Sequence, residues 1–105
     1  MILRIWHGWT TPANADRYEA LLRSEIIPGI LARGVAGFRG IELARRDLGT
    51  EVEFVTLMRF ASREAVASFA GADADTAVVP PAARALLARF DARAHHYDIS
   101  LQEIA

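Results

Sequence analysis

Apolar and polar positions alternate with two different periods along this chain. Residues 2–9 (ILRIWHGW) are mostly β-branched or aromatic and stop at a Thr-Thr-Pro sequence, which predicts a strand. Residues 37–46 and 51–60 predict two more strands, and the turn-forming residues 47–50 between them indicate an antiparallel hairpin. A last strand is predicted over about 93–101 (RAHHYDISL).

The segments between the strands show helical spacing. From Pro12 to about Ile27, apolar residues recur every three or four positions, with Thr11 or Asn14 as the candidate N-cap. Pro28 and Gly29 are expected to break this helix, because proline lacks a backbone donor and clashes one turn back. Ser62 should cap a second helix (REAVASFA), and Pro80–Pro81 should open a third, short helix that extends through Phe90.

The order strand, helix, strand, strand, helix, strand predicts an α+β fold. Two βαβ-like halves give a ferredoxin-like βαββαβ domain with a four-stranded antiparallel sheet, spatial order 4-1-3-2, and both main helices on one face. The 105 residues are enough for one core and not for two, so a single domain over residues 1–105 is expected.

The third strand predicts that both faces of the sheet are largely apolar. In it, Phe54, Thr56 and Met58 alternate with Val55, Leu57 and Arg59. Helices can cover only one face, and an exposed apolar sheet face is commonly an interaction surface. A homodimer packed sheet to sheet is therefore the expected partner arrangement.

Composition excludes several kinds of chemistry. All 12 basic residues are arginine, so no Schiff-base lysine exists, and the absence of cysteine excludes thiolate nucleophiles and Fe–S clusters. The net charge is −1 with both signs interspersed, which argues against nucleic acid or an anionic membrane as partner. No apolar run approaches 18 residues and no leader pattern stands at the start, so a cytoplasmic location is expected.

Histidine and aromatic residues mark a candidate site. In the 4-1-3-2 order, the end of the first strand (His7, Trp9) should lie beside the start of the last (His95, His96), bringing all three histidines to one end of the sheet. Because Leu3, Ile5 and Trp9 are strongly apolar, their face, which includes His7, is expected to contact the helices. Arg4 and Trp6 are expected on the opposite face, at the dimer seam.

Two alternatives remain for His7, which is either a general base tuned by burial or a core-edge histidine bound to a backbone carbonyl. By strand alternation only one of His95 and His96 can share its cavity. Tyr18 could present its hydroxyl to the same cavity, although a core tyrosine is the simpler interpretation. Two histidines without a matched acid fall short of a metal site.

The sequence resembles the antibiotic biosynthesis monooxygenase-like family of dimeric α/β-barrel proteins. The resemblance covers nearly the whole chain and rests on RIWHGWTTPANADRYEALL, GFRGIELARR, EVEFVTLMRFASREAVASFAG, VVPP and HHYDI. It implies homodimers whose sheets form a barrel. The haem-degrading branch matches poorly, since the first strand has no Asn, Phe60 stands where that branch has Trp, and residues 62–90 contain no His.

The resemblance and the histidines lead to two hypotheses of different classes. The first is a monooxygenase without a cofactor, which oxidises an electron-rich aromatic substrate after a histidine removes a proton. Its predicted catalytic residues are His7 and His96, and its predicted substrate-binding residues are Trp9, Tyr18, Phe60, His95 and Tyr97. The second is a dimeric module that binds a small apolar ligand without catalysis, and an isomerase or cyclase on the same scaffold is a third possibility.

Overall fold

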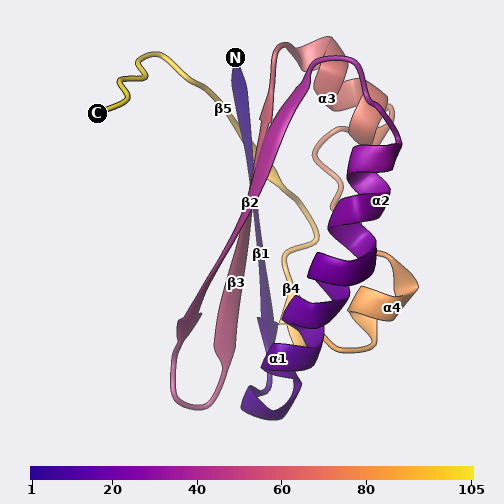
Figure 1. Cartoon of the computed structure of the whole chain (residues 1–105), viewed down its shortest axis with the longest axis vertical. Helices are drawn as coiled ribbons and strands as arrows, with labels where there is room; N and C mark the ends of the chain where they lie inside the picture. The colour runs from indigo at the N-terminus through magenta and orange to yellow at the C-terminus, as the bar shows by residue number, and fades with distance from the viewer.

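A computed structural model describes all residues, Met1–Ala105, and contains one antiparallel sheet with helices on one face (Figure 1). The strands are β1 (Ile2–Thr10), β2 (Phe38–Asp47), β3 (Val52–Phe60), β4 (Arg89–Phe90) and β5 (His95–Asp98). Their order is β2-β3-β1-β4, and β5 also pairs with β1. This confirms the predicted ferredoxin-like order, except that the fourth strand position is filled by two short strands, β4 and β5.

A local pairing explains why the last strand is split. Between β4 and β5, Ala77 N–H donates to Ala92 O and Ala94 N–H donates to Asp75 O, so residues 92–94 pair with the preceding loop. The indole Nε1 of Trp6 donates to Asp91 O over 2.7 Å in the gap that this detour leaves beside β1. The predicted strand over 93–101 is therefore shorter than expected, because its first residues bind the loop instead of β1.

The first helix does not end where Pro28 predicted. It consists of α1 (Pro12–Leu21), a π-helical turn η1 (Leu22–Ile26) and α2 (Ile27–Ala32), in direct succession. Thr11 is the N-cap. In the wider π-helical turn Ile27 N–H donates to Leu22 O, and Pro28 follows directly at the start of α2, where proline is tolerated best. The expected break at Pro28 was wrong for this reason.

The second half has one helix as predicted and one that is shorter. α3 (Arg63–Ala70) begins after Ser62, whose hydroxyl accepts from Ala65 N–H, which confirms the predicted cap. α4 spans only Pro81–Arg84, so the prediction of a helix through Phe90 was wrong. The edge of β1 offers unpaired carbonyls, and Ala88 N–H and Asp91 N–H donate to two of them, which draws Arg89–Phe90 into β4.

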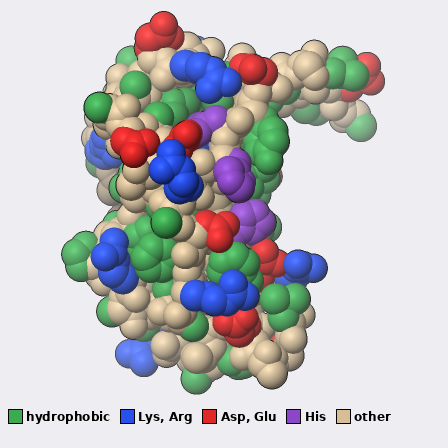
Figure 2. Space-filling model, turned by 180° about the vertical axis from the view of Figure 1, so that it is seen from behind, with side chains coloured by type: hydrophobic (Ala, Val, Ile, Leu, Met, Phe, Trp, Pro, Cys, Tyr) green, Lys and Arg blue, Asp and Glu red, His purple; other side chains and the backbone are tan.

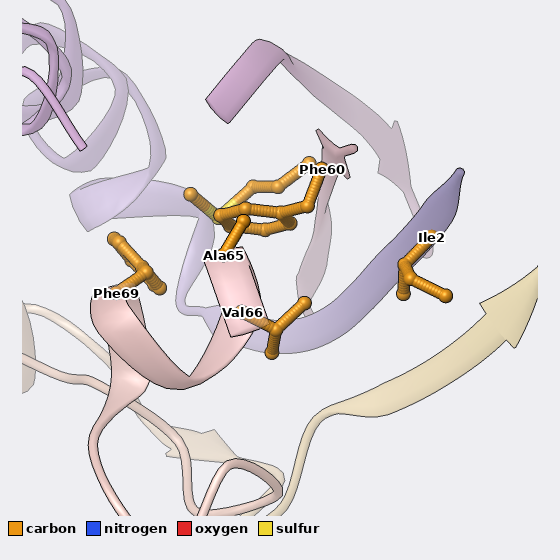
Figure 3. Close-up of a cluster of buried hydrophobic side chains, with 6 residues drawn as sticks. Ile2, Phe60, Ala65, Val66 and Phe69 are labelled. Carbon is orange, nitrogen blue, oxygen red and sulfur yellow. The ribbon is translucent and has the colours of Figure 1, made fainter. Parts of the chain in front are cut away.

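The core fills the layer between the sheet and the helices. One cluster joins the start of β1 and the end of β3 to α3, through Ile2, Met58, Phe60, Ala65, Val66 and Phe69 (Figure 3). The other joins α1, η1 and α4 to the opposite end of β3, through Ala15, Tyr18, Leu22, Val52, Phe54 and Ala83. No helix is both long and apolar enough to traverse a lipid bilayer.

The faces of β1 are the reverse of the expectation. Ile2, Arg4, Gly8 and Thr10 are buried, whereas Leu3, Ile5, His7 and Trp9 are half-buried on the face that no helix covers. Space fixes this choice at Gly8, where an added Cβ would lie 3.0 Å from Leu87 and 3.0 Å from the Trp6 ring. Hydrophobicity pointed to the wrong face because the helix side accommodates a buried arginine.

Candidate functional site

A narrow cavity lies between the helices and the sheet. Twelve of its 15 lining residues are hydrophobic, and its volume is about 60 Å³. β1 contributes Arg4 and Trp6, β3 contributes Thr56 and Met58, and α1 contributes Tyr18. The remaining wall consists of Ile41 of β2, residues of η1, α2, α3 and α4, and the loop residues 78–80. The cavity is therefore an apolar space with a few polar groups, which is the usual composition of a small-molecule site.

A chain of three polar side chains begins at Arg4 in the cavity wall and continues to His96 and Asp75, which line a polar groove on the outside beside β5. Arg4 Nη1 donates to His96 Nε2 over 2.9 Å, and His96 Nδ1 donates to Asp75 Oδ1 over 3.0 Å. The pairing of Arg4 with His96 across β1 and β5 places both on the helix side of the sheet. Only 5% of the His96 side chain is exposed. Because arginine only donates, Nε2 carries no proton here, and His96 is held as the neutral Nδ1–H tautomer.

The electrostatics of this chain keep His96 uncharged. Burial, and then the positive charge of Arg4, lower the pKa of His96, although the hydrogen bond with Asp75 acts in the opposite direction. The hydrogen bond from His96 lowers the pKa of Asp75. Burial also lowers the pKa of Arg4, an effect that the charge of Asp75 opposes. The arrangement is a carboxylate, a neutral imidazole and a guanidinium in sequence, which is typical of sites that handle protons.

Tyr18 and Trp6 form the aromatic part of the cavity wall. Tyr18 is 2% exposed, and its ring packs edge to face on Phe54 at 4.8 Å between centroids. Burial raises the pKa of Tyr18 to about 12, so its hydroxyl keeps its proton at neutral pH. The structure thus brings Tyr18 to the cavity as the sequence suggested. Trp6 also lines it, which corrects its expected place at the dimer seam.

His7 lies on the open face of the sheet, away from this cavity. His7 Nδ1 donates to Glu53 Oε2 over 2.8 Å, and Arg46 Nε donates to Glu53 Oε1 over 2.5 Å. These two hydrogen bonds, that from Arg46 first, lower the pKa of Glu53, whose side chain is only 8% exposed. His7 and His96 are therefore not brought together, and His7 binds a carboxylate where the alternative expectation was a backbone carbonyl.

The other predicted residues are divided between the two faces. Trp9 is on the open face, stacked 6.0 Å from His7 and covered by the Arg89 guanidinium at 3.9 Å. His95 and Tyr97 are exposed and line a shallow polar groove beside β5. Phe60 is 0% exposed within the packed core, so no ligand reaches it as it stands. Trp9, His95 and Tyr97 therefore share the open face of the sheet with His7. Phe60 lies on the helix side, as His96 and Tyr18 do, so the predicted site residues do not form one cavity.

Two members of the chain Arg4–His96–Asp75 were not predicted from the sequence. Arg4 was assigned to the dimer seam, and Asp75 was not considered because it lies in a loop of small residues. A cation within an apolar strand was the available signal for Arg4, since a charge is rarely buried without a function or a partner.

No group of three or more His, Asp or Glu side chains is arranged to hold a metal ion. Figure 2 shows the three histidines in one column on the side that carries β4 and β5.

The low pKa of His96 predicts a pH dependence of stability. Unfolding returns this imidazole to its ordinary pKa, so the unfolded chain binds a proton that the folded chain does not when the pH falls below about 6.5. The free energy of unfolding should therefore decrease from pH 7 towards pH 5, by at most about 1.4 kcal/mol per pH unit. Urea unfolding at several pH values measures it.

The exposed neighbour His95 is the matched control for this measurement. His96→Gln should flatten the decrease between pH 7 and pH 5, whereas His95→Gln should leave it unchanged. Arg4, Asp75 and Arg63 are the charged groups that act on His96. Asp75 titrates below this window because its pKa is itself lowered. An equal slope in wild type and His96→Gln would show that His96 is not the titrating group.

Comparison with known proteins shows the fold of the chain. No family model and no curated protein matches the sequence. Among solved structures, a "putative antibiotic biosynthesis monooxygenase" from Bacillus cereus aligns over 99% of this chain and 97% of its own, with 14% identity and a TM-score of 0.70. Rv0793 from Mycobacterium tuberculosis aligns over 99% and 98%, with 24% identity and a TM-score of 0.60. The chain thus has the fold of these proteins over its full length.

Proposed function

We propose that this protein belongs to the antibiotic biosynthesis monooxygenases and oxidises a small aromatic or enolisable substrate with O2 in the helix–sheet cavity. The observation that carries the proposal is Arg4 in the wall of an otherwise apolar cavity, where it is hydrogen-bonded to a neutral His96 that Asp75 holds. The full-length similarity to the fold of the Bacillus cereus protein supports it. In this reaction the substrate itself supplies the electrons.

The proposed chemistry begins with loss of a proton from the substrate. The base would be His96 Nε2, whose lone pair accepts from Arg4 Nη1 over 2.9 Å, so this hydrogen bond has to open before Nε2 takes the proton; Asp75 would then stabilise the imidazolium that forms. The substrate anion then reduces O2 and combines with it to a peroxide. Loss of water from the peroxide leaves a carbonyl, so a CH2 group and O2 give C=O and H2O. The apolar wall excludes bulk water from this sequence.

The substrate needs more room than the cavity of about 60 Å³ offers. The wall segment best suited to move is Val78–Val79, whose backbone groups make no hydrogen bond within the protein and of which Val78 is 50% exposed. Residues 74–77 precede this segment and are held by hydrogen bonds to Arg4 and to residues 92–94, and α4 follows it. We therefore place the entrance of the substrate at Val78–Val79.

The same narrowness favours a second candidate function, a module that binds a small apolar ligand without transforming it. Both candidate functions predict that a small apolar ligand binds in the cavity, and only the monooxygenase predicts that O2 is consumed. Oxygen consumption with a panel of electron-rich phenols and anthrones, corrected for their oxidation without protein, distinguishes the two. Binding of a panel member without added O2 uptake would support the module and reject the monooxygenase.

Variants locate the reaction. His96→Gln should reduce kcat by about 10²-fold or more if His96 is the base, and labelled O2 should place one oxygen atom in the product. Val55→Ala, on the open face of the sheet, should leave the rate unchanged. His7→Ala tests the sequence-based prediction separately. A loss of activity in His7→Ala together with full activity in His96→Gln would move the reaction to the open face and contradict the proposal.

A further inference from the structure

Arg4 is a buried cation without a carboxylate partner. Arg4 is only 3% exposed to solvent, yet it takes part in none of the ion pairs of the structure. Its acceptors are all neutral, namely Ala74 O at 2.5 Å, His96 Nε2 at 2.9 Å and Thr76 O at 3.2 Å. A buried charge that lacks an opposite charge costs several kcal/mol. The carboxylate that acts on Arg4, Asp75, does so only at a distance, with His96 between them, so the guanidinium has no anion in direct contact.

The guanidinium also has hydrogen-bonding capacity to spare. Arginine has five N–H donors, and the three bonds above use two on Nη1 and one on Nη2. The Nε–H and one N–H of Nη2 remain without an acceptor. A carboxylate can accept one hydrogen bond from each with its two oxygens, and a single anionic oxygen can accept from both. Arg4 belongs to the cavity wall, so these two N–H groups are the donors of Arg4 that remain for a ligand in the cavity.

The rest of the cavity specifies what accompanies such an anion. The wall around Arg4 is apolar, and the only other side-chain hydroxyls on it are those of Tyr18 and Thr56, neither of which forms a hydrogen bond within the protein. A ligand that fits would present one oxyanion to Arg4, a ring or short apolar body to Trp6 and Met58, and at most one further polar group.

We propose that the cavity recognises its ligand as an oxyanion, a small and mainly aromatic molecule whose carboxylate, phenolate or enolate oxygens bind the two free N–H groups of Arg4. The inference rests on the proposed function for the identity of the site, but it concerns recognition and does not require turnover. His96 acts here as a positioning residue, since its neutral Nε2 holds Arg4 Nη1 and leaves the other edge of the guanidinium to the ligand.

The test compares ligands that share one ring system and carry either a carboxylate or a neutral alcohol. Benzoate and benzyl alcohol, and then 2-naphthoate and 2-naphthylmethanol, are titrated into the whole protein and followed by calorimetry and by the indole N–H signals in NMR spectra. The chain has two tryptophans, of which Trp6 lines the cavity and Trp9 lies on the open face. The Trp9→Phe protein therefore assigns the two signals.

The expected result is at least about tenfold tighter binding of each carboxylate than of its alcohol, which corresponds to about 1.4 kcal/mol. The carboxylate should shift the Trp6 signal and leave the Trp9 signal in place. Equal affinities within each pair, a shift confined to Trp9, or no binding by either carboxylate would overturn the inference. This comparison needs no variant at Arg4, so it is decisive even if Arg4 proves necessary for folding.

Substitutions then assign the preference to a single side chain. Arg4→Met should abolish the preference, and Arg4→Lys should weaken it, because lysine keeps the charge but loses the fork. Arg63→Met is the matched control, since Arg63 is an exposed arginine that lines the outer groove beside β5, and it should retain the preference. A preference that survives in a folded Arg4→Met protein would contradict the inference.

These experiments distinguish a failure of the proposed recognition by Arg4 from a failure of the proposed monooxygenase activity. A carboxylate preference that depends on Arg4, without oxygen uptake by any phenol, would leave the inference standing and reject the monooxygenase. Oxygen uptake that is unaffected in a folded Arg4→Met protein would support the monooxygenase and reject recognition by Arg4.

Discussion

Replacing Phe54 with alanine should lower the free energy of unfolding by about 3–5 kcal/mol, which is the usual cost of removing a buried phenylalanine ring. Phe54 is 0% exposed in the middle of the sheet, where Tyr18 packs against its edge at 4.8 Å and the Arg45 guanidinium lies 5.1 Å from its ring centre. The void would lie in the buried cluster that Phe54 shares with Tyr18 and Val52. Urea unfolding, with the slope checked for two-state behaviour, measures the loss.

Two further substitutions define the size of that effect. Phe54→Leu retains most of the volume and should cost clearly less than Phe54→Ala. Leu101→Ala, at a residue that is 76% exposed, should remain within about 0.5 kcal/mol of wild type. A cost below about 1 kcal/mol for Phe54→Ala would mean that the packing of α1 on β3 is not as tight as the structure shows.

Gly37→Ala should destabilise the protein by about 2–5 kcal/mol, through two causes that act together. Gly37 has a φ of +84°, a conformation that an L-residue adopts at a cost. In addition, a Cβ at this position would lie 2.7 Å from the Cβ of Ala65, which is inside α3 and cannot turn away. Thermal and urea unfolding of the variant measure the sum of both costs.

Gly49 separates the two causes. It has nearly the same φ, +87°, but no atom lies within 4 Å of the place where its Cβ would be. Gly49→Ala should therefore cost only the backbone part, about 1–2 kcal/mol. If Gly37→Ala costs no more than Gly49→Ala, the close approach of α3 to the start of β2 is contradicted.

Local signals in the sequence predicted the first three strands, the starts of the helices and the order of the sheet. Thr11 and Ser62 cap helices because their hydroxyls accept from the backbone three residues later, a contact that lies entirely within one turn. The hairpin of β2 and β3 follows in the same way from residues 47–50. These elements leave few ways to connect two βαβ-like halves, so the 4-1-3-2 order was predictable too.

The candidate site was predictable only in part, because its key contacts join residues far apart in the chain. His96 and Tyr18 were predicted as site residues. The two hydrogen-bond partners of His96, Arg4 and Asp75, are 92 and 21 residues away from it in the sequence and were not predicted. Alternation established that His95 and His96 lie on opposite faces. It could not establish which face the helices cover, and this error moved His7 and Trp9 into the wrong layer.

The sequence by itself determined the strands, most helix boundaries and the sheet order, because capping, turn formation and alternation act over a few residues. Only the tertiary structure decided which face of β1 is buried, where the last strand divides and that Arg4 is enclosed without a carboxylate. These outcomes depend on how volumes fit and how backbone groups find partners across the whole molecule. Gly8 beneath Leu87 and residues 92–94 bound to the preceding loop are the contacts that settled them.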